Sequence, residues 1–283
     1  MQFFNVASGL GGCMAAVTLC LINQKGGCGK SSTCFHLAGA FAAEGYSVLI
    51  VDADPQGSLS QGFFGSDVIE NLPANETIAA IFDDNSFFLD QRSLVQPTDF
   101  PGISVVRTNQ SLAPYNAPCP EDAGMIQYSM RDFLEQFDEY DVVLIDCPPN
   151  LYQCSWNAMI ASDYVVIPVP PEDFATQGLR AVHQCIDNAR KLNPKLRRLG
   201  HLVTRFDRRL LVHCSYEERI RGIYRHMVLD TVVPEASAFK VALACRKPVE
   251  FYSKKSKAAV SMRSLVNELV NRIADRNEKR RIG

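Results

Sequence analysis

Positive charge is almost absent from the first 179 residues of this sequence. They contain only five Lys or Arg against 21 Asp or Glu, which gives a net charge of −16. Residues 180–283 contain 24 basic and 10 acidic residues, a net charge of +14, so the whole chain carries only −2. Such a split favours an anionic partner for the basic part, although Lys and Arg also cover ordinary solvated helices.

Three further absences limit the class of protein. No run approaches the roughly 18 consecutive apolar residues of a membrane-spanning helix, and no Lys or Arg precedes Lys25, so a charged signal-peptide start is missing. The ten cysteines include no Cys-x-x-Cys pair, which favours reduced, mostly buried thiols over disulfides. With 47% hydrophobic and 21% charged residues, the composition excludes low-complexity disorder. We therefore expect a cytoplasmic globular protein.

Short apolar segments alternate with segments of helical spacing along the chain. Seven segments rich in β-branched residues are candidate strands: 17–22, 48–51, 103–106, 142–145, 164–169, 199–203 and 229–233. Four segments between them have helical spacing: 31–43, 125–137, 176–192 and 216–224. The alternation predicts an α/β fold with a mainly parallel twisted sheet and helices on both faces.

No internal repeat and no linker divides the sequence, so we expect one domain over residues 1–283. Residues 1–14 are expected to be a poorly structured N-terminal extension, with no separate helix-turn-helix domain, and residues 62–96 to be irregular. An apolar stripe near the C-terminus predicts a helix docked on the core. A membrane anchor is the alternative for it, but the stripe lacks Phe and Trp and its polar face is not mainly basic. The stripe comprises Met262, Leu265, Val266, Leu269, Val270 and Ile273.

A glycine-rich loop lies directly after the first predicted strand and opens the first predicted helix. Residues 26–32 read Gly-Gly-Cys-Gly-Lys-Ser-Ser. The strict pattern G-x-x-x-x-G-K-[ST] needs Gly where this chain has Gln24, so the fit is to a variant loop. Small residues let backbone N–H groups converge on phosphate oxygens, and the helix N-terminus adds partial positive charge. Lys30 can reach the β and γ phosphates, and the Ser31 hydroxyl can complete a Mg²⁺ shell.

Acidic residues end two of the predicted strands. Asp52 and Asp54 follow the strand beginning at Val48, and Asp146 ends an apolar strand that is followed by Cys-Pro-Pro. Ligands of open parallel sheets bind at the carboxyl ends of strands, so all three carboxylates can face one phosphate chain. Three carboxylates together would repel one another, and Mg²⁺, which prefers hard oxygen ligands, removes that repulsion.

These motifs resemble the ParA/MinD group of deviant Walker A ATPases, and within it the ParA/Soj partition ATPases. Lys25-Gly-Gly-Cys-Gly-Lys-Ser-Ser is similar to the deviant P-loop, Asp52-Ala-Asp-Pro-Gln-Gly to the second motif, and Asp146-Cys-Pro-Pro to the Walker B end. Segments 203–209, 231–236 and 247–252 follow in the family's order and spacing, so the resemblance covers nearly the whole chain from about residue 15.

The resemblance implies ATP and Mg²⁺ as cofactors and gives roles to particular residues. Lys25 is similar to the signature lysine that reaches the partner's phosphates in a nucleotide-sandwich homodimer, Asp54 to the residue that orients the attacking water, and residues 146–157 to the γ-phosphate switch. The implied catalytic residues are Lys25, Lys30 and Asp54, and the implied metal residues are Ser31, Asp52 and Asp146. The implied nucleotide-binding residues are Lys25, Gly26, Gly27, Cys28, Gly29, Lys30, Ser31, Ser32, Pro234, Glu235 and Ala236.

Members of this family bind DNA without sequence preference as ATP-bound dimers, and phosphate neutralisation by Lys and Arg supplies such binding. Arg209 falls where one DNA-contacting arginine of the family lies. A second is matched here by Ala238, and Lys240 is the candidate substitute. The full set of DNA-binding candidates is Arg205, Arg208, Arg209, Arg219, Arg221, Lys240, Arg246 and Lys247.

The resemblance implies a nucleoid-associated ATPase switch that segregates or positions plasmid or chromosome DNA, with slow hydrolysis stimulated by a ParB-like adaptor. No stable membrane association is expected. One alternative is a membrane-associated positioning ATPase like MinD, and another is a related ATPase that positions a protein cargo. A third is an ATP-dependent iron-sulfur reductase of the same fold, for which Cys147 and Cys154 are the candidate ligands.

Overall fold

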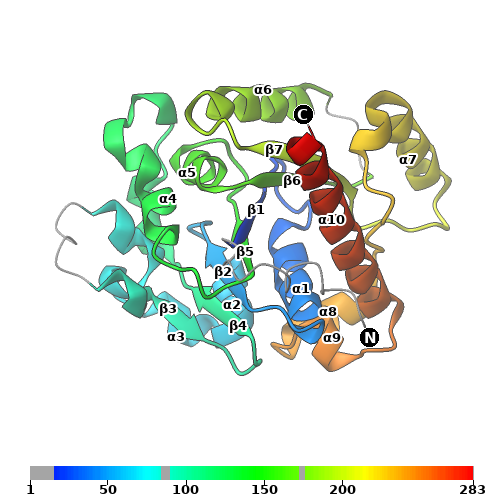
Figure 1. Cartoon of the computed structure of the whole chain (residues 1–283). Helices are drawn as coiled ribbons and strands as arrows, with labels where there is room; N and C mark the ends of the chain where they lie inside the picture. Colours follow the sequence, from blue (N-terminus) through cyan, green and yellow to red (C-terminus); the bar gives the residue numbers. More distant parts are fainter. Residues whose placement is uncertain (1–15, 84–89, 172–175, 283) are drawn as a thin grey trace.

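A computed structural model describes residues 16–83, 90–171 and 176–282. Its centre is a seven-stranded sheet with the order β3-β4-β2-β5-β1-β6-β7 (Figure 1). Only the β3–β4 pair is antiparallel, and the other neighbouring strands in this sheet run parallel. The strands are β1 Val17–Leu21, β2 Val48–Asp52, β3 Val95–Pro97, β4 Ile103–Val106, β5 Val142–Asp146, β6 Tyr164–Val169 and β7 Arg197–Val203.

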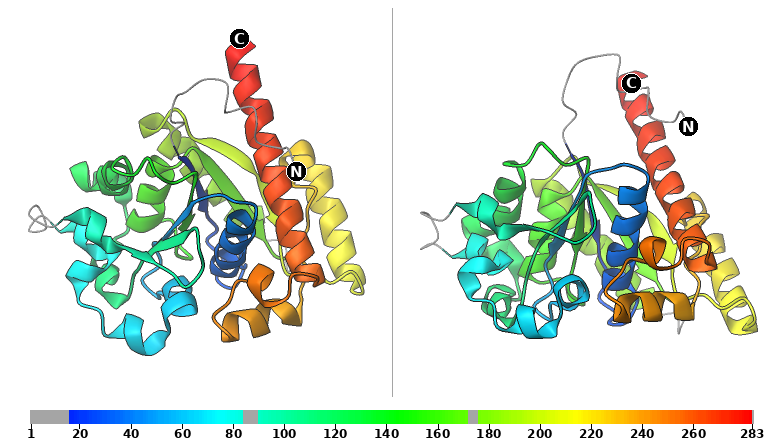
Figure 2. Two further views of the ribbon diagram at one scale, coloured as in Figure 1. Left: turned by 60° about the horizontal axis from the view of Figure 1, so that its bottom comes forward. Right: turned by 90° about the horizontal axis from the view of Figure 1, so that it is seen from below.

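Helices lie on both faces of this sheet, as the alternating pattern predicts (Figures 1 and 2). The α-helices are α1 Lys30–Ala43, α2 Ser58–Phe64, α3 Ser66–Glu70, α4 Ser129–Leu134, α5 Gln153–Ala161, α6 Thr176–Leu192, α7 Leu211–Tyr224, α8 Ser237–Ala244, α9 Val249–Tyr252 and α10 Lys257–Ile282. Short 3-10 helices are η1 Ala74–Glu76, η2 Ile78–Phe82, η4 Gln91–Leu94, η5 Gln110–Tyr115, η6 Pro120–Asp122, η7 Gly124–Tyr128 and η8 Arg225–Met227.

Successive residues of each central strand pack alternately into two separate core clusters, one on each face of the sheet. In β1, Leu19 and Leu21 pack with α1, α8 and α10 on one face, whereas Cys20 packs with α4, α5 and α6 on the other. This two-sided burial is why the strands are continuously apolar rather than alternating. The mainly parallel α/β fold predicted from the sequence is therefore confirmed.

The predicted strand over 229–233 is wrong. Only isolated bridges at Val228 and Pro234 join this segment to the β7 side of the sheet. Two of its backbone N–H groups, those of Asp230 and Thr231, donate instead to the Glu268 carboxylate at 2.7 Å each. A ladder cannot extend through donors that are already used, and Pro234 has no N–H to contribute.

Several other boundaries differ from the expectations. The three-residue edge strand β3, which ends at Pro97, was not expected, and the segment expected to be irregular holds the short helices α3, η1, η2 and η4. The helix expected over 125–137 is divided into η7 and the shorter α4. The expected extension at residues 1–14 lies outside the described residues.

The C-terminal stripe packs on the core, which confirms its predicted docking. Met262, Leu265 and Leu269 are fully buried against the α1 side of the sheet, and α10 runs beside α1 (Figure 2). The stripe is therefore occupied by intramolecular packing. Of the helices that the structure describes, none has both the length and the apolar character needed to cross a membrane.

Candidate nucleotide-binding site

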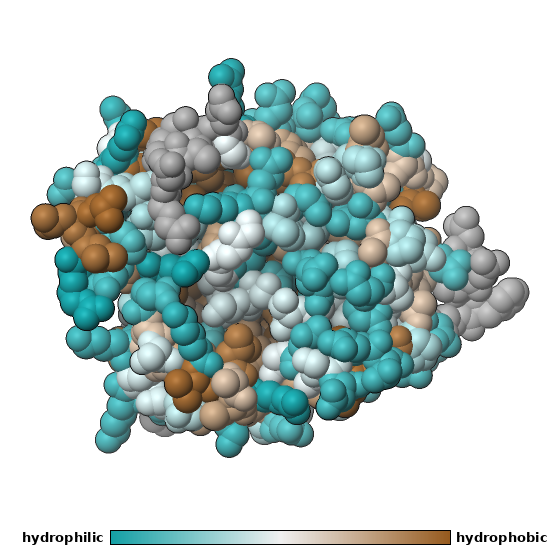
Figure 3. All heavy atoms as spheres, turned by 180° about the vertical axis from the view of Figure 1, so that it is seen from behind, coloured by the Kyte–Doolittle hydropathy of each residue, from teal (hydrophilic) through white to brown (hydrophobic). Residues whose placement is uncertain are grey.

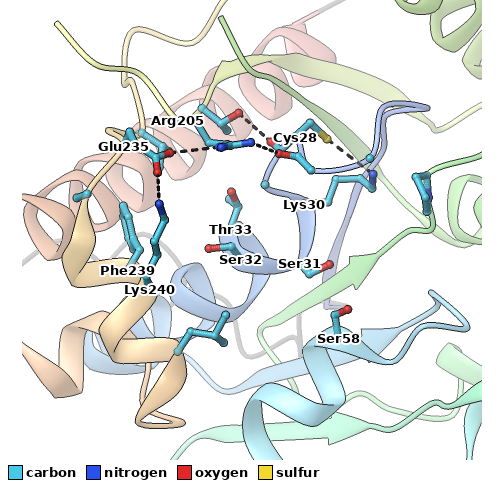
Figure 4. A pocket seen from close by; sticks show the side chains of 18 of the residues that line it. Cys28, Lys30, Ser31, Ser32, Thr33, Ser58, Arg205, Glu235, Phe239 and Lys240 are labelled. Atoms are coloured by element: carbon cyan, nitrogen blue, oxygen red, sulfur yellow. Dashed lines mark hydrogen bonds and ion pairs between the residues drawn. The ribbon is translucent and has the colours of Figure 1, made fainter. Parts of the chain in front are cut away.

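The glycine-rich loop borders a cavity of about 450 Å³ at the carboxyl edge of the sheet (Figure 4). The loop follows β1 and leads into α1, and the opposite wall comes from the chain after β7 and from α8. This is the edge at which ligands of open parallel sheets bind. The lining residues are Gly26, Gly27, Cys28, Gly29, Lys30, Ser31, Ser32, Thr33, Asp54, Gln56, Ser58, Pro149, Thr204, Arg205, Val233, Pro234, Glu235, Ala236, Phe239, Lys240 and Leu243.

The loop conformation depends on glycine at two positions. Gly27 has φ 70° and Gly29 φ 86°, in the left-handed region that side chains with a Cβ rarely adopt. Gly26 has open space where a Cβ would be, so the backbone there is accessible to a ligand. The Thr204 hydroxyl donates to the Cys28 carbonyl at 2.8 Å and fixes the loop to the end of β7. The result is an exposed backbone cradle at the N-terminus of the 14-residue helix α1.

The ammonium group of Lys30 is held within this loop. It donates to the carbonyls of Asn23 at 3.0 Å and Lys25 at 3.2 Å, and lies 3.7 Å from the Cys28 sulfur (Figure 4). Lys30 is only 6% exposed. Burial raises the pKa of the Cys28 thiol, the positive charge of Lys30 opposing the rise, so Cys28 is a neutral packing group at neutral pH. The loop thus presents one preorganised cation beside the cavity.

Two buried carboxylates lie opposite each other on β2 and β5, but their surroundings differ. Asp52 pairs in register with Asp146. The Asp52 carboxylate accepts hydrogen bonds from the Ser60 hydroxyl at 2.7 Å, the Ser60 N–H at 2.8 Å and the Asp54 N–H at 3.2 Å. Neither carboxylate oxygen of Asp146 has a hydrogen-bond partner of good geometry among the described residues. A fully buried carboxylate without partners requires explanation, because such groups are normally satisfied.

The ionisation of this pair follows from its burial. Burial raises the pKa of Asp52 to about 7, against the hydrogen bonds from Ser60. Burial and the neighbouring Asp52 raise the pKa of Asp146 well above its usual range, and the Ser31 hydroxyl partly opposes the rise. A divalent cation supplies the missing positive charge. Ser31, at the cavity wall, and Asp146 form an oxygen donor set that fits Mg²⁺, an ion that usually keeps several water ligands.

Asp54 lies nearer the cavity than the other two acidic residues. It lines the cavity, and its carboxylate accepts from the Gln56 N–H at 3.0 Å. Burial raises its pKa, and the positive charge of Lys30 opposes the rise. The structure therefore separates the three predicted carboxylates: Asp54 faces the cavity, Asp146 is buried without a hydrogen-bond partner of good geometry among the described residues, and Asp52 is engaged with α2 through Ser60.

Three charged side chains form a bridge across the other end of the cavity. Glu235 accepts from Arg205 at 3.2 Å and from Lys240 at 2.7 Å, and Arg205 also donates to the Gly27 carbonyl at 3.0 Å (Figure 4). Phe239 lies beside this bridge in Figure 4, away from Lys30 and Ser31. Arg205 and Lys240, expected at a DNA surface, are placed at the cavity by this geometry. The ion pairs with Arg205 and Lys240 lower the pKa of Glu235.

The other DNA-binding candidates are dispersed over the basic part of the chain. Arg209 is paired with Asp207 at 2.6 Å, and Arg221 with Glu217 at 2.9 Å. Arg246 packs its guanidinium against Gly65. Arg208, Arg219 and Lys247 are exposed.

Several cavity residues were not identified from the sequence. Thr204 and Arg205 follow directly on β7, so the rule that ligands bind at the carboxyl ends of strands could have found them. Gln56 and Pro149 lie within motifs that follow β2 and β5, so the same rule applies to them. Ser58, Phe239 and Leu243 carry no comparable signal, because they reach the cavity from helices α2 and α8, which only the folded chain brings together. Ser60 does not line the cavity, but its contact with Asp52 likewise has no signal in the sequence.

This fold and this loop define a P-loop nucleotide-binding protein. A family model described as an AAA domain matches residues 16–198. The chromosome partitioning protein ParA of Myxococcus xanthus is 31% identical over 266 residues, which cover 93% of this chain and 91% of that protein. ParA of Caulobacter vibrioides strain NA1000 is 33% identical over 92% of this chain and 96% of that protein. The chain belongs to the ParA/Soj family of partition ATPases, which confirms the predicted resemblance.

Solved structures of similar fold include nucleotide complexes. Cobyrinic acid a,c-diamide synthase of Mycobacterium smegmatis, with an ATP analogue and magnesium, has a TM-score of 0.75 and 26% identity over 90% of this chain and 95% of that one. The ATP complex of Cyanothece McdA(D38A) has a TM-score of 0.77 at 18% identity, over 90% of this chain and 96% of that one, and supports the fold alone.

Proposed function

We propose that this chain is a Mg²⁺-dependent ATPase switch, formed by a single P-loop domain, that drives segregation or positioning of DNA. The observation that carries the nucleotide part is the juxtaposition of a glycine cradle and the buried ammonium of Lys30 at one cavity with the buried carboxyl of Asp146, which lies behind Ser31 of the cavity wall and has no hydrogen-bond partner of good geometry among the described residues. A triphosphate and Mg²⁺ together supply the negative and positive charges that these groups lack. A glycine-rich turn without a ligand would need neither the cation nor the carboxylate.

Each group has a distinct part in this proposal. N–H groups of residues 26–32 bind phosphate oxygens, and Lys30 neutralises the β and γ phosphates. Ser31 and Asp146 hold Mg²⁺, with Asp52 positioning the second motif through Ser60. When bound, Mg²⁺ stabilises the charge that develops on the phosphate oxygens.

The remaining predicted residues act at the two ends of the cavity. Asp54 orients the attacking water, since it is the one of the three predicted aspartates that lines the cavity, on the side of the P-loop. Lys25 supplies a cation to the nucleotide of a second copy in an ATP-dependent homodimer. Pro234, Glu235 and Ala236 lie at the end of the cavity farther from Lys30, where they contact the base, and the bridge from Arg205 to Glu235 holds them against the P-loop.

DNA binding, adaptor stimulation and cargo are also proposed. The charge of +14 in residues 180–283 and the exposed side chains of Arg208, Arg219 and Lys247 support a sequence-independent contact with DNA phosphates. Two copies in a dimer double that basic surface. A ParB-like adaptor stimulates hydrolysis and releases the dimer, and the ATP-bound form is expected in the cytoplasm on the nucleoid.

Two of the alternatives meet structural obstacles. An anchor on the C-terminal stripe would need apolar side chains that are buried in the core, as at Leu265 and Leu269. An iron-sulfur cluster shared at a dimer axis would need surface thiols, whereas Cys147 and Cys154 are both fully buried. The alternative in which the ATPase positions a protein cargo instead of DNA differs only in the adaptor protein. It is therefore tested by identifying which protein stimulates ATP hydrolysis.

The experiment measures ATP hydrolysis and retention on double-stranded DNA with purified protein. We expect both to require ATP and Mg²⁺, and DNA retention to fall steeply with salt. Lys30→Ala should abolish both, whereas Lys195→Ala, at an exposed lysine remote from the cavity, should change neither by more than about two-fold. DNA retention that is independent of ATP, or that survives Lys30→Ala, would contradict the switch. Absence of any ATP binding would contradict the whole proposal.

A further inference from the structure

Apolar residues on the face in Figure 3 lie in several separate groups among hydrophilic ones, which is normal for the surface of a folded protein. A more specific feature lies inside the nucleotide cavity, where two consecutive residues after β7 hold two consecutive carbonyls of the P-loop. The Thr204 hydroxyl donates to the Cys28 carbonyl at 2.8 Å, and Arg205 Nη1 donates to the Gly27 carbonyl at 3.0 Å. The bonded residues are 176 and 178 positions apart in the chain, so only the fold brings them together.

The backbone of Arg205 has an uncommon conformation. Its φ of 54° lies in the left-handed region that residues other than glycine rarely adopt. Hydrogen bonds on either side hold it there: the Thr204 N–H donates to the Val169 carbonyl at 3.0 Å, and the Phe206 N–H donates to the Val233 carbonyl at 3.1 Å. An unfavourable backbone conformation persists where the surrounding structure requires it. This one therefore indicates that the position of the Arg205 side chain matters.

The two contacts with the P-loop fix the direction of two of its N–H groups. The C=O and N–H of a trans peptide point in opposite directions, and no peptide bond among the described residues is cis. Holding the Gly27 carbonyl therefore sets the direction of the Cys28 N–H, and holding the Cys28 carbonyl sets that of the Gly29 N–H. Glycine restrains backbone rotation less than other residues do, so contacts from outside the loop keep its donors in one arrangement. Donors that are already in place bind an anion more tightly, because binding does not have to order them.

We infer that Thr204 and Arg205 are positioning residues that hold the N–H groups of Cys28 and Gly29 in place for the phosphates of the nucleotide. This inference rests on the proposed nucleotide binding and adds two residues to which the P-loop pattern assigns no part. Arg205 has a second contact, since its Nε donates to Glu235 at 3.2 Å (Figure 4). Arg205 therefore joins the proposed base-binding segment to the P-loop, whereas the Thr204 hydroxyl acts on the P-loop.

The first test removes the Thr204 hydroxyl and keeps the shape of the side chain, as Thr204→Val. The dissociation constants for ATP and ADP, measured in Mg²⁺ by competition with a fluorescent ADP analogue, should rise about three- to ten-fold, as expected for the loss of one hydrogen bond. The dissociation constant for adenosine, which has no phosphate, should stay the same. Thr204→Ser, which keeps the hydroxyl, should bind all three ligands within about two-fold of the wild type.

Thr77→Val is the matched control for a loss of stability. Thr77 is buried outside the nucleotide cavity, and its hydroxyl donates to the Ala74 carbonyl at 2.9 Å. The same substitution there removes the same kind of bond, so it should lower the free energy of unfolding in urea. It should leave the dissociation constants for ATP, ADP and adenosine unchanged, because Thr77 does not line the cavity.

The second test is Arg205→Met, which keeps an unbranched side chain but removes all its donors. The dissociation constants for ATP and ADP should rise at least about three-fold. The dissociation constant for adenosine should rise as well, because the base-binding segment loses its connection through Glu235. Arg92→Met is the matched control: Arg92 also donates to a carboxylate, that of Glu139 at 3.0 Å, and to a backbone carbonyl, that of Gln136. It lies outside the cavity, so this variant should bind all three ligands like the wild type.

The outcomes separate this inference from the proposed function. Unchanged ATP affinity in Thr204→Val or in Arg205→Met overturns the inference and leaves the proposed nucleotide site intact. Equal losses for ATP and adenosine in Thr204→Val also overturn it, because the hydroxyl would then support the cavity as a whole. So does a Thr204→Ser variant that binds ATP as weakly as Thr204→Val, or a Thr77→Val variant that loses as much ATP affinity. Failure of the unmodified chain to bind ATP would instead refute the proposed function.

Discussion

Asp146→Asn should stabilise the metal-free protein while abolishing Mg²⁺-dependent ATP hydrolysis. The wild-type carboxylate is fully buried and lacks a hydrogen-bond partner of good geometry among the described residues. Burial and the nearby Asp52 raise its pKa well above the usual range, so the fold resists its ionisation. Leaving a buried acceptor unsatisfied costs on the order of 1–3 kcal/mol, and more when the group is charged. A neutral amide of the same shape avoids the additional cost of burying a charge.

Asp52→Asn is the matched control, because the same chemical change is made at the residue paired in register on the next strand. Its carboxylate accepts three hydrogen bonds, two of them from Ser60. Both Ser60 bonds go to one oxygen and the Asp54 N–H bond goes to the other, so an amide nitrogen in place of either oxygen leaves at least one buried N–H without its acceptor, at a cost of about 1–3 kcal/mol. Asp52→Asn should therefore have a free energy of unfolding lower than that of Asp146→Asn by about that amount.

Urea unfolding without metal at pH 7.5 and pH 5, together with ATPase assays, measures these effects. A raised carboxyl pKa means that stability is present below the unfolded pKa and is lost as pH rises, so the advantage of Asp146→Asn should be largest at pH 7.5. Asp146→Asn less stable than wild type at pH 7.5 would refute the reasoning, because the carboxylate would then be making structural contacts. Full Mg²⁺-dependent activity in that variant would refute its metal role.

Two predictions concern the scaffold. In Gly39→Ala the new Cβ would lie 2.3 Å from that of Pro248. Overpacking should therefore outweigh the gain in helix propensity and lower the free energy of unfolding by about 1–2 kcal/mol, as chemical unfolding measures it. The control is Gly222→Ala, at a position on α7 with open space for the Cβ, which should not destabilise the protein. Burial lowers the pKa of His201 to about 3 in the folded protein. The stability that its neutral form provides is therefore lost as pH falls below the pKa of histidine in the unfolded chain. Wild type should therefore lose about 1.4 kcal/mol more than His201→Gln between pH 7.5 and 5.5, and the exposed His226→Gln should behave like wild type.

Strand and loop features were predictable where the signal lies within a few consecutive residues. Six of the seven predicted strands are present, because two-sided burial demands unbroken apolar segments. The P-loop was predictable since glycine, lysine and hydroxyl positions at fixed spacing are needed to cradle a phosphate. The strand prediction for 229–233 was wrong because its composition is typical of a strand but does not reveal the distant Glu268. The Glu268 carboxylate accepts the hydrogen bonds of the Asp230 and Thr231 N–H groups, which a strand would have used in the sheet.

The sequence by itself therefore determined the P-loop, the acidic strand ends and the division into an acidic and a basic part, because each is a property of local order or composition. Tertiary structure decided which carboxylate we propose for the metal, since Ser60 satisfies Asp52, whereas no described residue makes a hydrogen bond of good geometry to Asp146. It also placed Arg205 at the cavity through Glu235. Such assignments depend on contacts between distant segments, and a carboxylate's chemistry depends on the partners that folding brings to it.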